Sequence, residues 1–165
     1  MSITALMGRV RMMVARAIVS LVDDAGGLQL VQLDALADET LDEVERFGSY
    51  GLASHPHPGA EAIVLCVGGL RSHAIAIAVE DRRYRLKNFR SGEVALYDDL
   101  GQVVHLTRDG IVLESTKPVT IKTPHATVNA DRVDLGGAGG KAIARVGDPV
   151  EGGRITAGSQ KVFSG

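Results

Sequence analysis

Between Ser91 and Gly137 the sequence alternates short apolar pairs with turn residues, and this pattern leaves no room for a helix. The two members of each pair are two residues apart, so their side chains lie on one face of a short strand. Asp, Gly, Pro or Asn separates most of the pairs, which indicates a turn after each strand. The apolar residues of the six pairs are Val94, Leu96, Val104, Leu106, Ile111, Leu113, Val119, Ile121, Ala126, Val128, Val133 and Leu135.

A ribbon of this kind has one apolar edge and almost no thickness. Even a compact domain of about 60 residues buries only about 60% of the surface that its unfolded chain exposes. The ribbon therefore cannot form a core by itself. The sequence predicts that it packs against copies of itself or against a large neighbour.

The composition favours an all-β chain. The 165 residues include 20 glycines and no tryptophan, and aromatic residues make up only 4%; large rings need depth to bury their area, so their rarity favours thin β structure. No run approaches the roughly 20 apolar residues of a membrane span, and no secretory signal is recognisable. The single cysteine, Cys66, lies in an apolar run and is expected to be a buried hydrophobic residue.

The first 90 residues predict one short helix and a small barrel. Residues 3–14 place several apolar side chains on one helical face, with Ser2 as a plausible N-cap. We expect strands at 15–22, 28–33, 47–53, 62–67 and 74–80, and we interpret the acidic segment 38–46 as a solvated loop or a single helical turn. Five short strands without a long helix suggest a closed barrel of the OB type.

A basic segment joins the predicted barrel to the ribbon. Residues 82–90 contain four arginines, one lysine and two aromatic residues, which is a composition that can bind single-stranded nucleic acid. The alternative is a linker whose long cationic side chains cover the top of the ribbon. The whole chain has 18 Lys and Arg against 20 Asp and Glu, without a basic excess, and this balance favours the linker.

The sequence contains no recognisable catalytic or metal-binding constellation. His55 and His57 flank a proline, but no cysteine or acidic residue accompanies them at ligand spacing, so a loop is expected there. His105 and His125 alternate with inward-facing apolar residues and are expected to face outward. There is no Ser-His-Asp or Cys-His arrangement and no phosphate loop. We therefore predict that the chain is not an enzyme and needs no cofactor.

Several segments together resemble a known family. They are residues 44–51, 58–62, 77–85, 92–98 and 105–111, which read VERFGSYG, PGAEA, IAVEDRRYR, GEVALYD and HLTRDGI. In this order they are similar to the baseplate spike, or baseplate assembly protein V, of contractile-tailed phages, and above all to the Mu-type spike. The resemblance covers nearly the whole chain, with barrel, basic segment and ribbon in sequence.

The resemblance implies a homotrimeric central spike of the virion tail, made in the host cytoplasm. An OB-fold domain would dock on the tail hub protein, an intertwined triple-stranded β-helix would form the shaft, and the C-terminus would pierce the bacterial outer membrane when the sheath contracts. Three ribbons wound together would also remove free sheet edges, which agrees with the sequence pattern. The predicted parts are an N-terminal segment at 1–14, the OB-fold domain with its basic joint at 15–90, the shaft at 91–137 and the tip at 138–165.

The last residues, from about 144 onward, resemble part of the PAAR-type tip that caps related spikes. Family tips often hold axial iron or zinc through histidine or cysteine, but this chain has neither after His125. Either the tip is metal-free and packed around Ile155, Val162 and Phe163, or another protein completes it; we expect the first. Some related spikes carry a lysozyme domain, for which this chain has no insertion. The alternative function is an OB-fold nucleic-acid-binding protein with the ribbon as its oligomerisation stalk.

Overall fold

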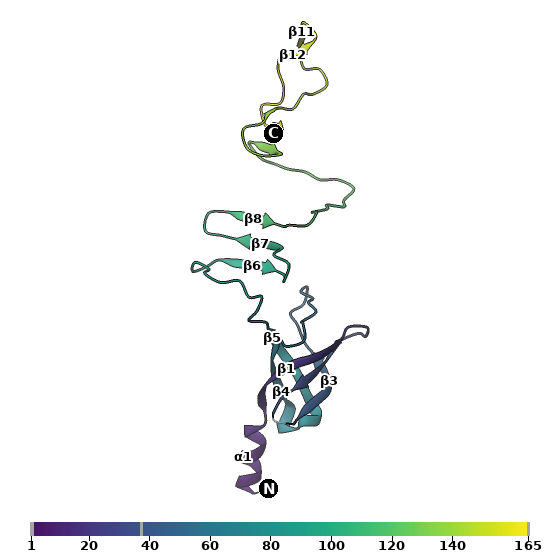
Figure 1. Ribbon diagram of the computed structural model, residues 1–165, viewed down its shortest axis with the longest axis vertical. Coiled ribbons are helices and arrows are strands. Elements are labelled where there is room, and N and C mark those ends of the chain that lie inside the picture. The colour runs from purple at the N-terminus through teal and green to yellow at the C-terminus, as the bar shows by residue number, and fades with distance from the viewer. Residues whose placement is uncertain (1, 37, 165) are drawn as a thin grey trace. The chain divides into compact units, whose positions relative to one another are not determined.

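The computed structural model describes residues 2–36 and 38–164, and it describes the backbone but not the side chain of Phe163 (Figure 1). The described chain is mostly β structure with one short α-helix. It divides into two compact units, one ending at Pro118 and the other beginning at Val119. Each unit is described by itself below. No helix among the described residues has the length and apolar character that a membrane crossing requires.

The chain begins with the predicted helix, α1 (Ile3–Arg11). The Ser2 hydroxyl accepts a hydrogen bond from the Ala5 N–H at 3.3 Å, so the predicted N-cap is confirmed. Arg9 and Arg11 lie in the last turn, where a positive charge interacts favourably with the helix dipole. The helix ends before the predicted residue 14, because the next strand begins at Val14 and its register continues the barrel.

Five strands close the predicted barrel in the order β1-β2-β3-β5-β4. Neighbouring strands are antiparallel except for β3 and β5, which are parallel. A small closed barrel of this order fits the OB-fold. The strands are β1 (Val14–Asp23), β2 (Gln29–Asp34), β3 (Thr40–Arg46), β4 (Glu61–Cys66) and β5 (Ala74–Glu80), and the 3-10 helices η1 (Val67–Gly69) and η2 (Arg71–His73) join β4 to β5.

The barrel holds the hydrophobic core. Leu33, Val64 and Cys66 have no exposed surface, so Cys66 is the buried hydrophobic residue that the sequence predicted. The other buried apolar residues are all aliphatic, and all but Leu41 are alanine or valine, which agrees with the rarity of aromatic rings in the composition. They are Ala17, Val19, Val31, Leu41, Val44, Ala60, Ala62 and Ala76.

The interpretation of residues 38–46 as a loop or helical turn is wrong, because most of this segment is β3. Leu41 and Val44 both point into the core although they are three residues apart. A bulge allows this: the pairing with β2 shifts register here, and Glu43 has a left-handed φ of 52°. The bulge interrupts the strict alternation by which strands are recognised in a sequence.

The predicted strand at 47–53 is also wrong. Phe47 donates one further backbone hydrogen bond, to the carbonyl of Ala76 at 3.0 Å, and the chain then leaves the barrel. A turn follows, closed by the Leu52 N–H and the Ser49 carbonyl at 3.0 Å. Gly51 occupies a left-handed conformation with φ 86°, which lies outside the extended region of a regular strand.

After the barrel, three short strands form an antiparallel meander in the order β6-β7-β8. These are the first three strands predicted for the ribbon, β6 (Val94–Tyr97), β7 (Val103–Leu106) and β8 (Ile111–Glu114). Residues 119–130 form no strand in the described structure, although two apolar pairs predicted strands there. A strand requires a hydrogen-bonded neighbour, and this single chain offers none to that segment.

The second unit contains two small sheets. Its three-stranded sheet has the order β10-β13-β9, in which β13 runs parallel to β9, and a separate hairpin pairs β11 with β12. Gly136 and Gly137 follow β9 with positive φ angles, as the glycine-rich sequence allows. The strands are β9 (Val133–Leu135), β10 (Lys141–Ala142), β11 (Val150–Glu151), β12 (Arg154–Ile155) and β13 (Val162–Ser164).

Candidate functional site

The β6-β7-β8 meander gathers the first three predicted apolar pairs on one face. Two rows of directly opposed residues cross the three strands. Side chains alternate between the faces of a strand, so all six side chains project from the same side of the sheet. The first row is Val94, Leu106 and Ile111, and the second is Leu96, Val104 and Leu113. We call this surface the apolar face.

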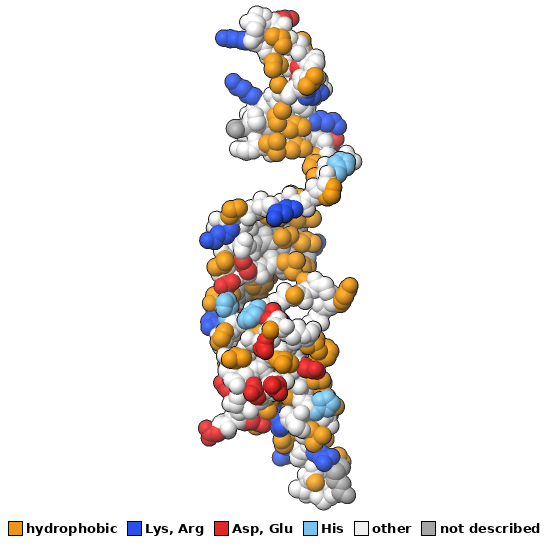
Figure 2. Space-filling model, turned by 90° about the vertical axis from the view of Figure 1, so that its right-hand side faces the viewer, with side chains coloured by type: hydrophobic (Ala, Val, Ile, Leu, Met, Phe, Trp, Pro, Cys, Tyr) orange, Lys and Arg blue, Asp and Glu red, His pale blue; other side chains and the backbone are white. Residues whose placement is uncertain are grey.

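The apolar face is largely uncovered in the single chain. Val104, at its centre, is half-buried, whereas the other five side chains are exposed, from 45% for Leu106 to 75% for Ile111. Figure 2 shows hydrophobic side chains at the surface of this part of the molecule. A contiguous apolar surface of this kind marks an interaction site on a soluble protein.

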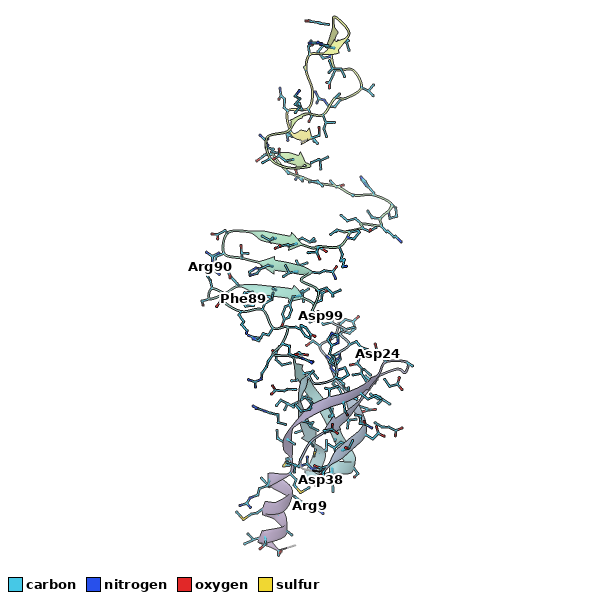
Figure 3. The ribbon with its side chains drawn as sticks, viewed as in Figure 1. Arg9, Asp24, Asp38, Phe89, Arg90 and Asp99 are labelled. Carbon is cyan, nitrogen blue, oxygen red and sulfur yellow. The ribbon has the colours of Figure 1, made fainter. Side chains whose placement is uncertain are left out.

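The opposite face of the meander carries polar contacts. His105 lies between Val104 and Leu106 but faces the other way, as predicted, and its ring meets Phe89 edge-on at 5.0 Å between centroids. Its Nε2 lies 3.6 Å from the Glu93 carboxylate. Figure 3 labels Phe89 and Arg90 beside β6. The segment before β6 therefore packs against the His105 side of the meander and leaves the apolar face exposed.

Glu93 holds the start of the meander together. Its carboxylate accepts hydrogen bonds from the backbone N–H of Arg90 at 2.9 Å and from the Arg90 guanidinium at 2.8 Å. It also accepts one from the backbone N–H of Arg108, in the β7–β8 turn, at 3.2 Å. These hydrogen bonds, led by the Arg90 N–H, lower the pKa of Glu93 to about 2. The sequence pattern does not reveal this role, because two of the three donors are backbone N–H groups.

The remaining predicted ribbon residues are less regular. Val119, Ile121 and Val128 are exposed apolar side chains in the segment without strands, and Ala126 is exposed as well. In β9, Val133 is half-buried and Leu135 is exposed. The structure thus unites the first six predicted core residues in one surface and does not bring the last six together with them.

The predicted tip residues occupy different positions in the second unit. Val162 is half-buried in β13 opposite Val133, whereas Ile155 lies exposed in β12. The side chain of Phe163 lies outside what the structure describes. Ser159, which the sequence analysis did not single out, is buried, and its hydroxyl accepts hydrogen bonds from the N–H groups of Lys161 and Val162 at 3.1 and 2.9 Å.

Among the residues that the structure describes, no histidine belongs to a group that could hold a metal ion. His57 faces Asp99 at 3.2 Å and the ring of Tyr84 at 5.3 Å, so it joins the barrel loop to the β6–β7 turn. Within the described residues, no three His, Cys, Asp or Glu side chains are placed to hold a metal ion. Iron or zinc of the kind that the family resemblance implies does not fit the second unit, where Asp134 and Asp148 are paired with Arg132 and Arg145.

The arginines of the basic segment are paired with carboxylates. Arg82 bonds to Glu61, Arg83 to Asp81 at 2.6 Å, and Arg85 to Glu80 at 3.1 Å. Arg90 reaches both Glu93 and Asp109. The arginine hydrogen bonds lower the pKa values of Glu61 and Asp81, so these carboxylates stay ionised. Charges neutralised in this way leave little to attract nucleic acid, and the linker interpretation is favoured.

Comparison with known proteins places these features in a family. Residues 16–83, which cover the barrel, match the family described as Bacteriophage Mu Gp45, N-terminal. The chain is 43% identical over 137 residues to the baseplate puncturing device gp45 of Escherichia phage Mu, an alignment that covers 78% of this chain and 70% of the relative. The chain belongs to the Mu gp45 family. A second gp45 relative, the Mu-like prophage FluMu protein gp45 of Haemophilus influenzae, is 40% identical over 123 residues, which cover 74% of this chain and 67% of that protein.

Proposed function

We propose that this gp45 family member is the central spike of a contractile phage tail baseplate, a homotrimer that punctures the outer membrane of the host when the sheath contracts. The exposed apolar face of the meander carries the proposal, because a chain that works alone would leave this surface in water. Its gp45 relative from phage Mu is named a baseplate puncturing device, which supports the same role.

In the proposed trimer, the apolar faces of three meanders meet around one axis. Each face would bury its two rows of side chains against the other two chains, which supplies the core that one thin sheet lacks. The segment 119–130 would find its strand neighbours on other chains and continue the shaft as an intertwined triple-stranded β-helix. The proposed core residues are the twelve of the predicted ribbon, from Val94 and Leu96 to Val133 and Leu135.

The other parts have roles that follow from this arrangement. Residues 15–90 would dock the spike on the tail hub, 91–137 would form the shaft and 138–165 a PAAR-like tip that meets the membrane. The parallel pairing of β13 with β9 supports this order, because it ties the last residues of the chain to the end of the shaft. The work of such a spike is mechanical, and we propose that it proceeds without catalysis or a bound metal.

Two measurements test the proposal. Light scattering coupled to size exclusion should give a mass of about 52 kDa, three times the chain mass of 17.4 kDa. A stable monomer would overturn the trimer. Electron microscopy of contractile particles labelled with an antibody against this chain should show the label at the distal end of the tail; label on the head or along the sheath would overturn the spike assignment.

A further inference from the structure

Positive and negative side chains are concentrated in different segments of the first 46 residues, although the net charge of the whole chain is only -2. Residues 1–22 contain three arginines and no acidic residue, whereas residues 34–45 contain six acidic residues and no lysine or arginine. Arg9 and Arg11 have no ion-pair partner among the described residues, and neither have Glu43 and Glu45. Figure 2 shows acidic side chains gathered on the barrel. A chain that carries two unpartnered surfaces of opposite charge is suited to bind a copy of itself.

Both surfaces lie at the same end of the barrel, on the two sides of the η1–η2 turn. Gly69 of η1 packs against the backbone of Arg9 at the end of α1, and Arg71 of η2 pairs with Glu39 at 3.2 Å. Figure 3 labels Arg9 and Asp38 at this end. In a closed ring of head-to-tail contacts, one surface of each chain binds a different surface of the next chain, so both surfaces must lie at the same end of the barrel.

The acidic surface, which is formed by residues 34–45, contains a groove. This groove has a volume of about 310 Å³ and lies between β3 and η2. Its lining includes Asp42 and Glu43 on one side and Arg71 on the other, and the charge of Arg71 is already balanced by Glu39. The groove therefore attracts a cationic side chain. Leu36 and Leu70, in the turns that lead into β3 and η2, add exposed apolar surface.

The helix has the complementary surface. Ile3, Leu6, Met7 and Val10 are all exposed, and no residue of α1 is buried. A helix of nine residues is marginal in water without tertiary packing, even with a good cap. Arg9 and Arg11 match the acidic groove in charge, and the apolar side chains of the helix match the exposed leucines in the turns that lead into β3 and η2.

We propose that α1 of each chain docks in the groove between β3 and η2 of the next chain, so that three such contacts close a ring at the N-terminal end of the spike. This inference rests on the proposed trimer. The partner is a second copy of this chain, because the acidic groove and the basic helix occur once in each chain and face the same end. Arg9 and Arg11 would lie against Glu43 and Glu45, and the helix apolar side chains against Leu36 and Leu70.

Cross-linking of the full-length protein tests the contact. Ser72 lines the groove and Val10 is exposed on α1, so the double variant Val10→Cys/Ser72→Cys should yield a covalent trimer with a short bis-maleimide. Native Cys66 is fully buried, which makes the unmodified chain a clean control. The single variants should give no covalent trimer. Cross-linking by Val10→Cys alone would show that the helices bundle with one another, and would overturn the proposal.

Charge reversal separates this contact from a merely structural role of the arginines. Arg9→Glu/Arg11→Glu should lower the cross-linking yield by roughly tenfold, and the added changes Glu43→Arg/Glu45→Arg should restore it. A loss of helix stability alone would not be rescued by changes on β3. If light scattering shows a trimer and the cross-linking yield is the same in the charge-reversal variants, the proposed contact is wrong but the proposed spike is unaffected. If the chain is a monomer, both fall.

Discussion

The Glu93 carboxylate accepts a hydrogen bond from the backbone N–H of Arg108 at 3.2 Å, and so ties the start of β6 to the turn between β7 and β8. The same carboxylate accepts two hydrogen bonds from Arg90 in the segment that leaves the barrel. Its side chain is only 5% exposed. One carboxylate therefore fixes both the geometry of the meander and its connection to the barrel.

Glu93→Gln should destabilise the meander and change its response to acid. The pKa of Glu93 is about 2 in the folded protein, below its ordinary value of 4.5, so its stabilising effect is complete above about pH 4.5 and is lost as the pH falls toward 2. Thermal unfolding followed from pH 7 to pH 2 should show a smaller loss of Tm in Glu93→Gln than in the parent chain, and a lower Tm at pH 7.

The control for this experiment is Glu114→Gln. Glu114 lies exposed in β8, and its carboxylate has no ion-pair partner among the described residues. The Tm of Glu114→Gln should depend on pH in the same way as the Tm of the parent chain. Other carboxylates with lowered pKa values, such as Asp81 and Asp134, titrate in all three proteins, so only the difference between profiles counts. Identical profiles for Glu93→Gln and the parent would contradict the role given to Glu93.

Leu113→Asp should prevent trimer formation, because it places a charge in the middle of the proposed three-chain core. Val112→Asp is a matched control: Val112 is the preceding residue of β8, it is exposed at 45%, and it points to the opposite face of the meander. Light scattering should show a monomer for the first variant and a trimer for the second. Equal masses for the two variants would mean that the apolar face does not hold the chains together.

The difference between what the sequence predicts and what it misses has a physical cause. Strands whose apolar residues recur at every second position, such as β6 and β8, are predictable because this spacing places those side chains on one face of the sheet. In β3 the bulge at Glu43 breaks that pattern, so the strand escapes notice although Leu41 and Val44 are buried. The Glu93 cluster escapes for another reason. Two of the three donors to its carboxylate are backbone N–H groups, and only the folded β7–β8 turn brings the N–H of Arg108 close.

Leu33→Ala should destabilise the barrel by about 2–5 kcal/mol, because it leaves a cavity beside the remaining core side chains. Leu33 has no exposed surface. Leu52→Ala removes the same atoms from a side chain that is 60% exposed, and its effect on the free energy of unfolding should be within about 0.5 kcal/mol. Denaturant unfolding at fixed protein concentration measures both. A small effect of Leu33→Ala would argue against the packed barrel.

The purified protein should contain no stoichiometric iron or zinc, and chelation should leave its Tm unchanged. The reason is the lack of ligands: no histidine or cysteine follows His125, and the carboxylate of Asp148 accepts hydrogen bonds from Arg145. A metal site needs ligands that are free to coordinate. Elemental analysis decides the matter, since one iron or zinc per trimer would require a tip built differently from the one proposed.

Gly69→Ala should detach α1 from the barrel. A Cβ at this position would come within 2.9 Å of the Arg9 Cα and closer still to its carbonyl oxygen, and Gly69 also has a left-handed φ of 72°. We expect a loss of about 2–5 kcal/mol, from backbone strain and from the collision with the helix. Gly68→Ala is the matched control, because Gly68 has a similar φ of 64° but faces open space, so only the strain of about 1–2 kcal/mol applies. Denaturant unfolding gives the two values. Equal losses would mean that the helix does not pack on η1, and the ring of contacts proposed for the N-terminal end would lose its support.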